Sequence, residues 1–598
     1  MDAGAVLGVE RSVCGRSWRF PLDDGREGPA IAERLALPEI VGRLLAYRGV
    51  GLDQAPEFLA PRLRHQLPDP LHLRGMDLAC ARLVRAVRGG ETIGVFGDYD
   101  VDGATSAALL LRFFSAVGAA TRLYVPDRLR EGYGPNAAAL ARLQADGAGI
   151  VVTVDCGTTA HQPLADAARR GLEVIVIDHH VAEPRLPRAL AVVNPNRLDE
   201  DSPHKSLAAV GVAFLLVVAV NRALRESGWY GDARPEPDLL GWLDLVALGT
   251  VCDVVPLTGL NRALVAQGIK VARRGANPGL AALSAVAGIA RPLDAWHLGF
   301  ALGPRVNAGG RVGAASPDFD PAIGARLLAT DDPVLAAELA RRLDDCNRER
   351  REIEARLLDA AVAAVESMPQ SPALVFASAS GWHPGVIGIV AARLKERYQR
   401  PACVVAIADG IGRGSARSVA GLAIGPAVIA ACQAGLLING GGHAMAAGFT
   451  VAAEQVEALR AFLAERLGDG IDSGGVVPKL FIDGALTVAA AQSGLIDELD
   501  RLAPFGAANP EPRFVFPGVR VLHAEPVGSE HLSCALTDPL DGARLRGIAF
   551  RAAATPLGRF LAETRGATIH VAGHLRRDIW HGGDAVELRI DDAALAQG

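Results

Sequence analysis

The sequence predicts a multidomain α/β protein with a doubly wound parallel-sheet domain, a second α/β domain joined to it by a long helix, and a C-terminal β-barrel. Three patterns lead to this fold class. Short apolar runs alternate with helical stretches from about Met76, one helical pattern continues from Pro333 to about Glu366, and strands without long helices fill the chain from about Val477. Alternating strands and helices are typical of parallel strands joined by crossover helices, whereas a run of strands alone is typical of a barrel.

The composition and charge indicate a large globular protein. Half of the residues are hydrophobic, which allows cores for roughly three or four domains. No apolar stretch of about 20 residues occurs and the N-terminus lacks a basic segment followed by an apolar core, so we expect a cytoplasmic protein without a membrane anchor. The eight cysteines form no CxxC pair, which argues against a zinc ribbon and a disulfide framework. The net charge of -6 gives no sign of nucleic-acid binding, so any DNA-binding surface must be local.

The patterns divide the chain into six predicted segments. These are a partly helical N-terminal lead-in (1–70), the doubly wound domain (71–230), a helical part that completes its core (231–332), the long connecting helix (333–368), the second α/β domain (369–470) and the barrel (471–598). We assign no chemistry to the lead-in. The NRERRE patch of the long helix, Asn347 to Glu352, is typical of a solvated face, and a face turned toward a substrate is the alternative.

The stretch from Thr92 to Ser106 ends a predicted strand with three acids at every second position, Asp98, Asp100 and Asp102. In an extended segment alternate side chains share a face, so all three carboxylates can point to one place. They repel one another strongly unless cations hold them. An EF-hand calcium loop is one alternative, but its twelfth position would need Glu where this chain has Leu109. A solvated acidic turn without chemistry is the other.

Further acids and imidazoles follow other predicted strands. Strands are expected near 92–97, 122–125, 150–155, 173–178 and 191–194. The third ends on Asp155, and the fourth is followed by Asp178, His179 and His180. Ligands of such sheets bind beyond the carboxyl ends of the strands, so these groups should meet. Asp253 interrupts an apolar segment. A lone Asp of this kind is more often a helix cap or part of a buried turn. The acids at the other strand ends nevertheless favour a role for Asp253 as a ligand.

Carboxylates and imidazole without a thiolate suit Mn²⁺ or Mg²⁺, and the histidine favours Mn²⁺. Six or seven such side chains exceed what one ion takes from a protein, so two ions are implied. A pair of divalent ions is the arrangement that hydrolyses phosphoesters.

The motifs GDYDVDGATS, VDCGT, IDHH with NPN at Asn194 to Asn196, and GTVCDVVPL resemble the four motifs of the DHH phosphoesterases. GRSW at Gly15 to Trp18, PDRLREGYG at Pro126 to Gly134 and GPRVNAGGR at Gly303 to Arg311 resemble the branch of single-strand-specific 5′→3′ DNA exonucleases. The resemblance implies metal ligation by Asp98, Asp100, Asp102, Asp155, His179 and Asp253. It implies a catalytic set of Asp100, Asp102, Asp155, His179, His180 and Asp253, with His180 close to the scissile phosphate. The division of ligands between the ions, and whether Asp98 binds a metal directly, stay open.

The second α/β domain resembles the DHHA1 subdomain that accompanies DHH domains. Its segments GRGSARS at Gly412 to Ser418 and GGGHAMAAG at Gly440 to Gly448 have the composition of Gly-rich turns, which let backbone approach a phosphate. The resemblance implies that a DNA 5′ end is bound by Arg128, Arg311, Ser415, Arg417 and His443.

The terminal segment contains the predicted strands KLFIDGAL, VRVLHAEPV, HLSCALT, ARLRGIAF, TIHVAGHLRR and DAVELRI, and the same resemblance makes their barrel an OB-fold. OB-folds bind single strands through a basic groove and base stacking. Aromatic residues are scarce here, being Phe550, Phe560 and Trp580. Binding should therefore depend on arginines and be salt-sensitive, with candidates at Arg544, Arg546, Arg576 and Arg577. A barrel that only packs against its neighbours is the alternative.

The resemblance implies a 5′→3′ exonuclease that releases 5′ mononucleotides from single-stranded DNA by two-metal hydrolysis, in DNA repair and recombination. One alternative is another DHH enzyme acting on pyrophosphate, polyphosphate, short oligonucleotides or cyclic dinucleotides. The other is a catalytically dead DNA-binding scaffold, which the complete set of ligand positions disfavours. No GxxxxGK[ST] motif occurs, so a separate helicase must unwind duplex DNA. The implied partners are single-stranded DNA, single-strand-binding protein and a RecQ-type helicase, and the chain is expected to be a monomer.

Overall fold

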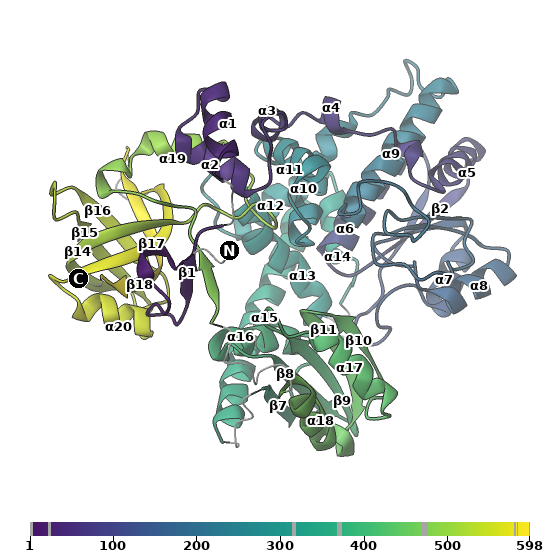
Figure 1. Cartoon of the computed structure of the whole chain (residues 1–598). Helices are drawn as coiled ribbons and strands as arrows, with labels where there is room; N and C mark the ends of the chain where they lie inside the picture. The colour runs from purple at the N-terminus through teal and green to yellow at the C-terminus, as the bar shows by residue number, and fades with distance from the viewer. Residues whose placement is uncertain are drawn as a thin grey trace. The chain divides into compact units, whose positions relative to one another are not determined.

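The computed structural model describes residues 4–21, 25–313, 319–367, 373–468, 477–578, 582 and 584–596. These residues form two compact units. The barrel unit consists of Met1–Gln66, Pro256–Ala266 and Val477–Gly598, and the two-sheet unit consists of Leu67–Val255 and Gln267–Val476 (Figure 1). The predicted six-segment division stays a prediction.

The first sheet of the two-sheet unit is parallel throughout, as the alternating pattern predicts. Its order is β3 (Thr121–Tyr124), β2 (Thr92–Gly97), β4 (Ala148–Val154), β5 (Glu173–Ile177) and β6 (Ala191–Val193). One face packs against α7 (Ala137–Ala145) and α8 (His161–Arg169). Helices α5 (Met76–Gly89), α6 (Val101–Ala116) and α9 (Ala209–Glu226) also contact the strands. The doubly wound sheet is therefore confirmed.

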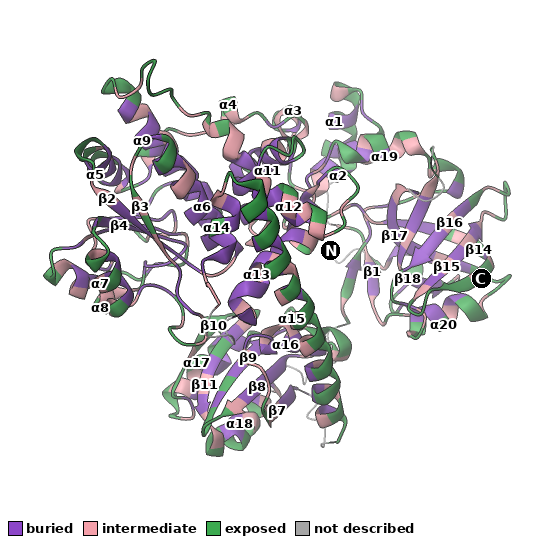
Figure 2. Ribbon diagram, turned by 180° about the vertical axis from the view of Figure 1, so that it is seen from behind, coloured by how far each residue is buried: buried purple, intermediate pink, exposed green. Residues whose placement is uncertain are grey.

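A helical region follows the first sheet and ends in one long helix. It contains α10 (Leu243–Cys252), α11 (Gly259–Ala272), α12 (Pro278–Val286), the π-helical turn η4 (His297–Leu302), α13 (Gly303–Arg311), α14 (Ile323–Ala329) and α15 (Pro333–Ser367). The 35 residues of α15 confirm the uninterrupted helix, which spans about 50 Å at about 1.5 Å per residue. It packs against α12, α13 and α14 and also against α16 (Ile387–Tyr398), so it joins the two sheets of its unit. Figure 2 shows its long exposed face.

The second sheet is mixed, with the order β10 (Asn439–His443), β11 (Ala446–Ala452), β9 (Ile411–Arg417), β8 (Ala402–Ala408) and β7 (Val375–Ser380). Helices α17 (Ile424–Gln433) and α18 (Val456–Gly468) pack with it. The expectation that GRGSARS is a Gly-rich turn is wrong, because six of its residues, Gly412–Arg417, belong to strand β9. A Cβ at Gly414 would collide with the ring of Phe449, so this glycine serves close packing between strands.

The barrel unit contains a closed ring of strands. Its order is β14 (Phe514–Val527), β15 (His531–Thr537), β16 (Arg544–Ala549), β18 (Val586–Leu595) and β17 (Thr568–Arg577), and β17 pairs with β14 to close it. The short helices α19 (Ser493–Asp500) and α20 (Pro556–Glu563) accompany the strands. The start of the first predicted strand lies outside the ring. There β12 (Lys479–Phe481) pairs in parallel with β1 (Ser17–Arg19), while β13 (Gly484–Ala485) pairs in parallel with the start of β14.

The lead-in builds the core of the barrel unit. Helices α1 (Glu27–Leu35) and α2 (Glu39–Tyr47) bury Ile31 and Leu44 in the same hydrophobic cluster as Phe514 of the barrel. The short helices α3 (Ala55–Leu59) and α4 (Leu63–Gln66) follow. Arg262 is 1% exposed, and it donates hydrogen bonds to the carbonyls of Phe58 and Ala503.

Three of the four arginines proposed for the barrel groove form ion pairs in the described residues. Arg546 pairs with Asp578 at 3.0 Å, Arg576 with Glu587 at 2.6 Å, and Arg577 with Asp497. A DNA phosphate would have to displace these carboxylates, whereas Arg544 is exposed. Phe550 is half-exposed beneath the Arg576 guanidinium, Phe560 packs against the core, and Trp580 lies outside the described residues.

Within the described part of the chain, no helix has the length and apolar character needed to cross a bilayer.

The buried carboxylate of Asp592 joins the N-terminal strand to the barrel. It accepts hydrogen bonds from Ser12 Oγ at 2.6 Å, from Trp18 Nε1 at 3.2 Å and from the Cys14 amide at 3.2 Å.

We predict that Asp592→Ala lowers the free energy of unfolding of the barrel unit by about 2 kcal/mol, because buried donors lose a charged acceptor. Urea unfolding, with hydrogen exchange of the β1 and β18 amides, measures the change. The exposed Asp53→Ala is the control, and unchanged protection of β1 in Asp592→Ala would contradict the role.

Candidate metal centre

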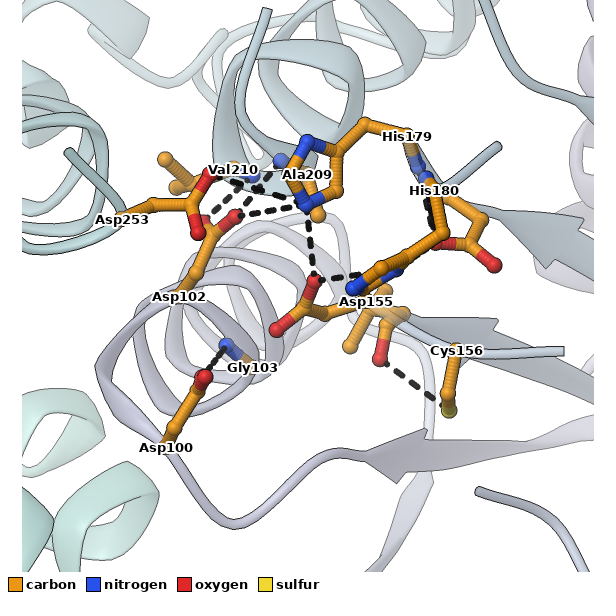
Figure 3. Close-up of polar contacts among 12 residues, drawn as sticks. Asp100, Asp102, Gly103, Asp155, Cys156, His179, His180, Ala209, Val210 and Asp253 are labelled. Carbon is orange, nitrogen blue, oxygen red and sulfur yellow. Dashed lines mark hydrogen bonds and ion pairs between the residues drawn. The ribbon is translucent and has the colours of Figure 1, made fainter. Parts of the chain in front are cut away.

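The predicted acids and imidazoles meet at the carboxyl edge of the first sheet (Figure 3). Asp98 follows β2, Asp155 follows β4, and His179 lies two residues beyond the end of β5. Asp253 follows the last residue of α10. The strands are parallel, so their ends deliver side chains from distant parts of the sequence to one crevice.

The acids after β2 converge for a different reason from the predicted one. The extended segment ends early, because Asp100 is the N-cap of α6 and accepts a hydrogen bond from the Gly103 amide at 3.1 Å. Asp102 lies in the first turn of this helix. Asp98 and Asp100 therefore face Asp155, while Asp102 faces a different part of the centre.

Three overlapping groups of side chains have ligand atoms within 4.8 Å of one another. They are Asp98 with Asp100 and Asp155; Asp155 with His179 and His180; and Asp102 with His179 and Asp253. Asp155 and His179 each belong to two groups, so the seven residues predicted for metal binding and catalysis form one connected set. Shared residues of this kind are what a pair of neighbouring cations requires.

Several buried atoms of this set have no hydrogen-bond partner among the described residues. They are Asp98 Oδ1, Asp155 Oδ1, His179 Nε2 and Asp253 Oδ2. His179 Nε2 lies 3.3 Å from Asp155, 3.6 Å from Asp253 and 3.9 Å from Asp102, and in Figure 3 these carboxylates point toward its ring. Buried polar atoms are normally satisfied, so the set lacks a partner. Hard oxygen donors with one imidazole fit Mn²⁺ or Mg²⁺.

The carboxyl groups of the centre have raised pKa values. Burial, with the neighbouring charge of Asp100, raises the pKa of Asp98 and of Asp155 well above the usual range. Burial and the charge of Asp253 raise the pKa of Asp102 to about 7, and burial and Asp100 raise the pKa of Asp253 to about 7. Without cations some of these groups therefore hold protons at neutral pH.

Asp102 is also bound by the N-terminus of α9. Its oxygens accept hydrogen bonds from the amides of Ala209 at 2.7 Å and Val210 at 2.9 Å. A Cβ at Gly249 would lie 3.0 Å from Asp102 Oδ1, so a glycine here lets α10 approach. The helix dipole partly compensates one buried charge of the set.

Polar residues that the sequence did not assign orient the two histidines. Asp178 accepts hydrogen bonds from the amide of His179 at 2.8 Å and lies 2.8 Å from His180 Nδ1. Asn194 donates to the His180 carbonyl, and Asn196 donates to the His179 carbonyl. Burial alone would lower the pKa of His180, but the hydrogen bond and charge of Asp178 raise it to about 9. The IDHH and NPN motifs were the available signal for this network.

Tyr133 is a further residue that the sequence did not assign. Its hydroxyl donates to the carbonyl of Asp155 at 3.0 Å and lies 3.2 Å from His180 Nδ1. Asp155 has a φ of 61°, a conformation that side-chain-bearing residues rarely adopt. The Tyr133 hydrogen bond helps to hold it there, so the motif PDRLREGYG contributes this tyrosine as well as Arg128.

The arginines predicted to bind a phosphate gather beside the centre. Arg417 donates to Ser415 Oγ at 3.0 Å, Arg311 donates to the Gly385 carbonyl at 3.4 Å, and the Arg128 guanidinium lies 4.9 Å from the Tyr99 ring. None of the three arginines forms an ion pair with a carboxylate of the described residues. A Cβ at Gly388 would lie 3.0 Å from the Arg417 guanidinium, so the N-terminus of α16 adjoins the cluster.

Burial and the charges of neighbouring arginines lower the pKa values of two arginines in the cluster. Burial, with the charges of Arg128 and Arg350, lowers the pKa of Arg311 to about 10. Burial and Arg128 lower the pKa of Arg417. Arg350 belongs to the NRERRE patch, and its side chain is 13% exposed, so at this position the patch is not a solvated face. Arg350 is paired with Glu354 at 2.8 Å, whereas Arg128, Arg311 and Arg417 have no ion pair in the described residues. Half-buried arginines without a carboxylate partner can bind phosphate.

His443 is the one predicted contact outside this cluster. It is exposed at the end of β10 and pairs in register with Ala446, which pairs with Arg417. His443 thus lies at the level of Arg417 but two strands away, about 10 Å at the usual strand spacing.

Comparisons with known proteins agree with this geometry. The sequence matches the DHH family, N-terminal domain over residues 92–250, the DHHA1 domain over 361–469 and the RecJ OB domain over 482–592. It is 41% identical over 528 residues to the single-stranded-DNA-specific exonuclease RecJ of Dickeya dadantii, covering 86% of this chain and 89% of that protein. It is 38% identical over 544 residues to the Escherichia coli protein of the same name, covering 89% and 91%.

Solved structures give the same result. RecJ from Thermus thermophilus in complex with Mn²⁺ matches with a TM-score of 0.79 at 30% identity, covering 97% of this chain and 80% of that chain. The Mg²⁺ complex of that protein matches with a TM-score of 0.74 at 29% identity, covering 97% and 79%. The chain therefore belongs to the RecJ family.

Proposed function

We propose that the chain is a metal-dependent exonuclease that degrades single-stranded DNA from its 5′ end and releases 5′ mononucleotides. The observation that carries the proposal is the connected set of acids and imidazoles around Asp155 and His179, with unpartnered buried atoms and an arginine cluster beside it. The relatives with which the chain shares its domains are named as single-stranded-DNA-specific exonucleases, which supports this activity over that of the other DHH enzymes. The complete set disfavours a catalytically dead scaffold.

Two divalent cations, Mn²⁺ or Mg²⁺, would be held by Asp98, Asp100, Asp102, Asp155, His179 and Asp253. Such ions stabilise the charge that develops on a phosphodiester and make water nucleophilic near neutral pH. His180 has a separate role in this proposal. Its ring is 47% exposed and is kept protonated by Asp178, so it can donate a hydrogen bond to an oxygen of the scissile phosphate.

The 5′ phosphate of the strand would bind Arg128, Arg311, Ser415 and Arg417, with His443 on β10 as a further contact. These side chains come from the loop after β3, from α13 and from strands β9 and β10 of the second sheet. Arg350 lies beside them but is paired with Glu354. An anchored terminal phosphate places the first phosphodiester at a fixed distance from the metal centre. This fixed distance accounts for both the 5′→3′ direction and the release of single nucleotides.

The finer partners are also proposals. A separate RecQ-type helicase would unwind duplex DNA, because the chain lacks a GxxxxGK[ST] motif. Single-strand-binding protein would cover the strand before degradation, as the family resemblance implies. We propose that the chain acts as a cytoplasmic monomer in DNA repair and recombination.

Removing a central ligand should abolish hydrolysis without unfolding the protein. We predict that His179→Ala and Asp100→Ala each lower Mn²⁺-dependent release of nucleotides from 5′-labelled single strands by at least about 100-fold. The partly exposed His161→Ala and the exposed Asp146→Ala are matched controls and should keep the wild-type rate. A near-normal rate in either central variant would refute the assigned site.

The arginine cluster should set the preference for a 5′ phosphate. We predict that Arg417→Ala lowers the ratio of rates on 5′-phosphorylated and 5′-hydroxyl strands by about 10-fold, because a charged hydrogen bond is lost. Arg460→Ala, on an exposed face of α18, is the control. An unchanged ratio in Arg417→Ala would remove this residue from the phosphate site.

Metal binding should release protons. The pKa values of about 7 for Asp102 and Asp253 mean that these carboxyls hold protons at pH 6 without metal. A cation favours the charged carboxylates, so binding of Mn²⁺ at pH 6 should expel protons, and the number should fall as the pH rises above about 8. Titration calorimetry in two buffers of different ionisation enthalpy counts them. Binding without proton release at pH 6 would contradict the prediction.

A further inference from the structure

Two exposed aromatic side chains lie on the two-sheet unit and have no role in the site described above. Trp296 is 55% exposed and Phe300 is 72% exposed, more than other aromatic residues in the described part of the chain. Their rings are stacked, with centroids 5.9 Å apart and an interplanar angle of 26°. A stacked apolar pair turned toward solvent is typical of a binding surface.

The turn that carries this pair is anchored by buried neighbours. The buried His297 meets the Trp296 ring edge-on at 5.4 Å, and its Nδ1 lies 2.6 Å from Asp294 Oδ1. Leu298 is fully buried on the same turn. The Cys252 thiol lies 3.5 Å from the Leu298 carbonyl, so the turn rests on the end of α10, next to the metal ligand candidate Asp253. Rigid aromatic side chains lose little entropy on binding.

The aromatic pair begins a stripe that leads to the arginine cluster. Trp296 directly precedes η4, which continues into α13 without a break. Helical residues spaced three or four apart share one face, and this face carries Trp296, Phe300, Pro304, Asn307 and Arg311. All five are at least partly exposed, while the residues between them are mostly buried. Phe300 lies about 16 Å from Arg311 at about 1.5 Å per residue. Figure 1 shows α13 beside α15, on the side of the second sheet.

The stripe of exposed side chains runs from Trp296 to Arg311, so the molecule that binds the aromatic pair should be the one whose phosphate binds Arg311. We propose that Trp296 and Phe300 form a stacking platform for unpaired nucleobases of the strand whose 5′ phosphate is held by the arginine cluster, a few nucleotides from that end. The proposal rests on the proposed nuclease function and adds a cause of strand selectivity. The faces of bases in a duplex are covered by their neighbours, whereas bases of a single strand are free to stack on protein rings.

An abasic scan tests the platform without catalysis. 5′-phosphorylated single strands with one abasic nucleotide at successive positions are bound to the protein without divalent cation, and binding is measured by fluorescence anisotropy. In the wild type, loss of the base at one or two interior positions should weaken binding about 10-fold. The penalty should vanish in the Trp296→Leu/Phe300→Leu variant, which keeps apolar surface but removes both rings. The variant Phe300→Tyr should keep the penalty.

Either of two results overturns the platform: no position-dependent penalty in the wild type, or the same penalty in the double leucine variant. If the double variant does not fold, the single variant Phe300→Leu replaces it. This variant should show a smaller loss of binding at the abasic positions than the wild type does. With Mn²⁺, strands too short to reach the platform should be cut equally by wild type and variants, while longer strands should be cut more slowly by the variants. If the wild type cuts neither the short nor the long strands, the proposed nuclease function is wrong. The abasic binding scan then still shows whether Trp296 and Phe300 stack on bases.

Discussion

The repulsion among buried carboxylates at one edge of a parallel sheet is the constraint on which the rest of this structure depends. Asp98, Asp102 and Asp155 are each less than 5% exposed, and burial together with the neighbouring carboxylates raises their pKa values. A protein keeps such an arrangement only where something compensates the charge. The N-terminus of α9 and the protonated His180 compensate part of it, and the unpartnered atoms of Asp155 and His179 leave room for divalent cations to compensate the rest.

Opposite charges are separated in the two-sheet unit. The acids gather where β2, β4, β5 and α10 end, and the arginines come from the loop after β3, from α13, from α15 and from the second sheet. The long helix α15 contacts elements on both sides, so it helps to keep the two clusters in register. Like charges face one another within each cluster. Under the proposed function, a substrate phosphate and its metal ions would compensate these charges.

The alternation of strands and helices predicted the first sheet, because buried parallel strands are short apolar runs and their carboxyl ends are marked by acids. The family motifs predicted the arginines. Local patterns could not predict long-range partners: β1 pairs with β12 across most of the chain, and the lead-in shares a core with the barrel. The glycines of GRGSARS indicated a turn, although Gly414 serves packing within a strand. Asp178, Tyr133 and Arg350 lie in patterns that the sequence does show, IDHH, PDRLREGYG and NRERRE, but their individual partners are set by contacts made only in the fold.

The central claim is that the carboxylates around Asp155 enclose a pair of cations. Anomalous diffraction at the manganese edge from crystals soaked in Mn²⁺ tests it most directly. Two peaks are expected within this set of side chains. A single peak outside the set, or no peak at a concentration of Mn²⁺ that supports hydrolysis, would contradict it.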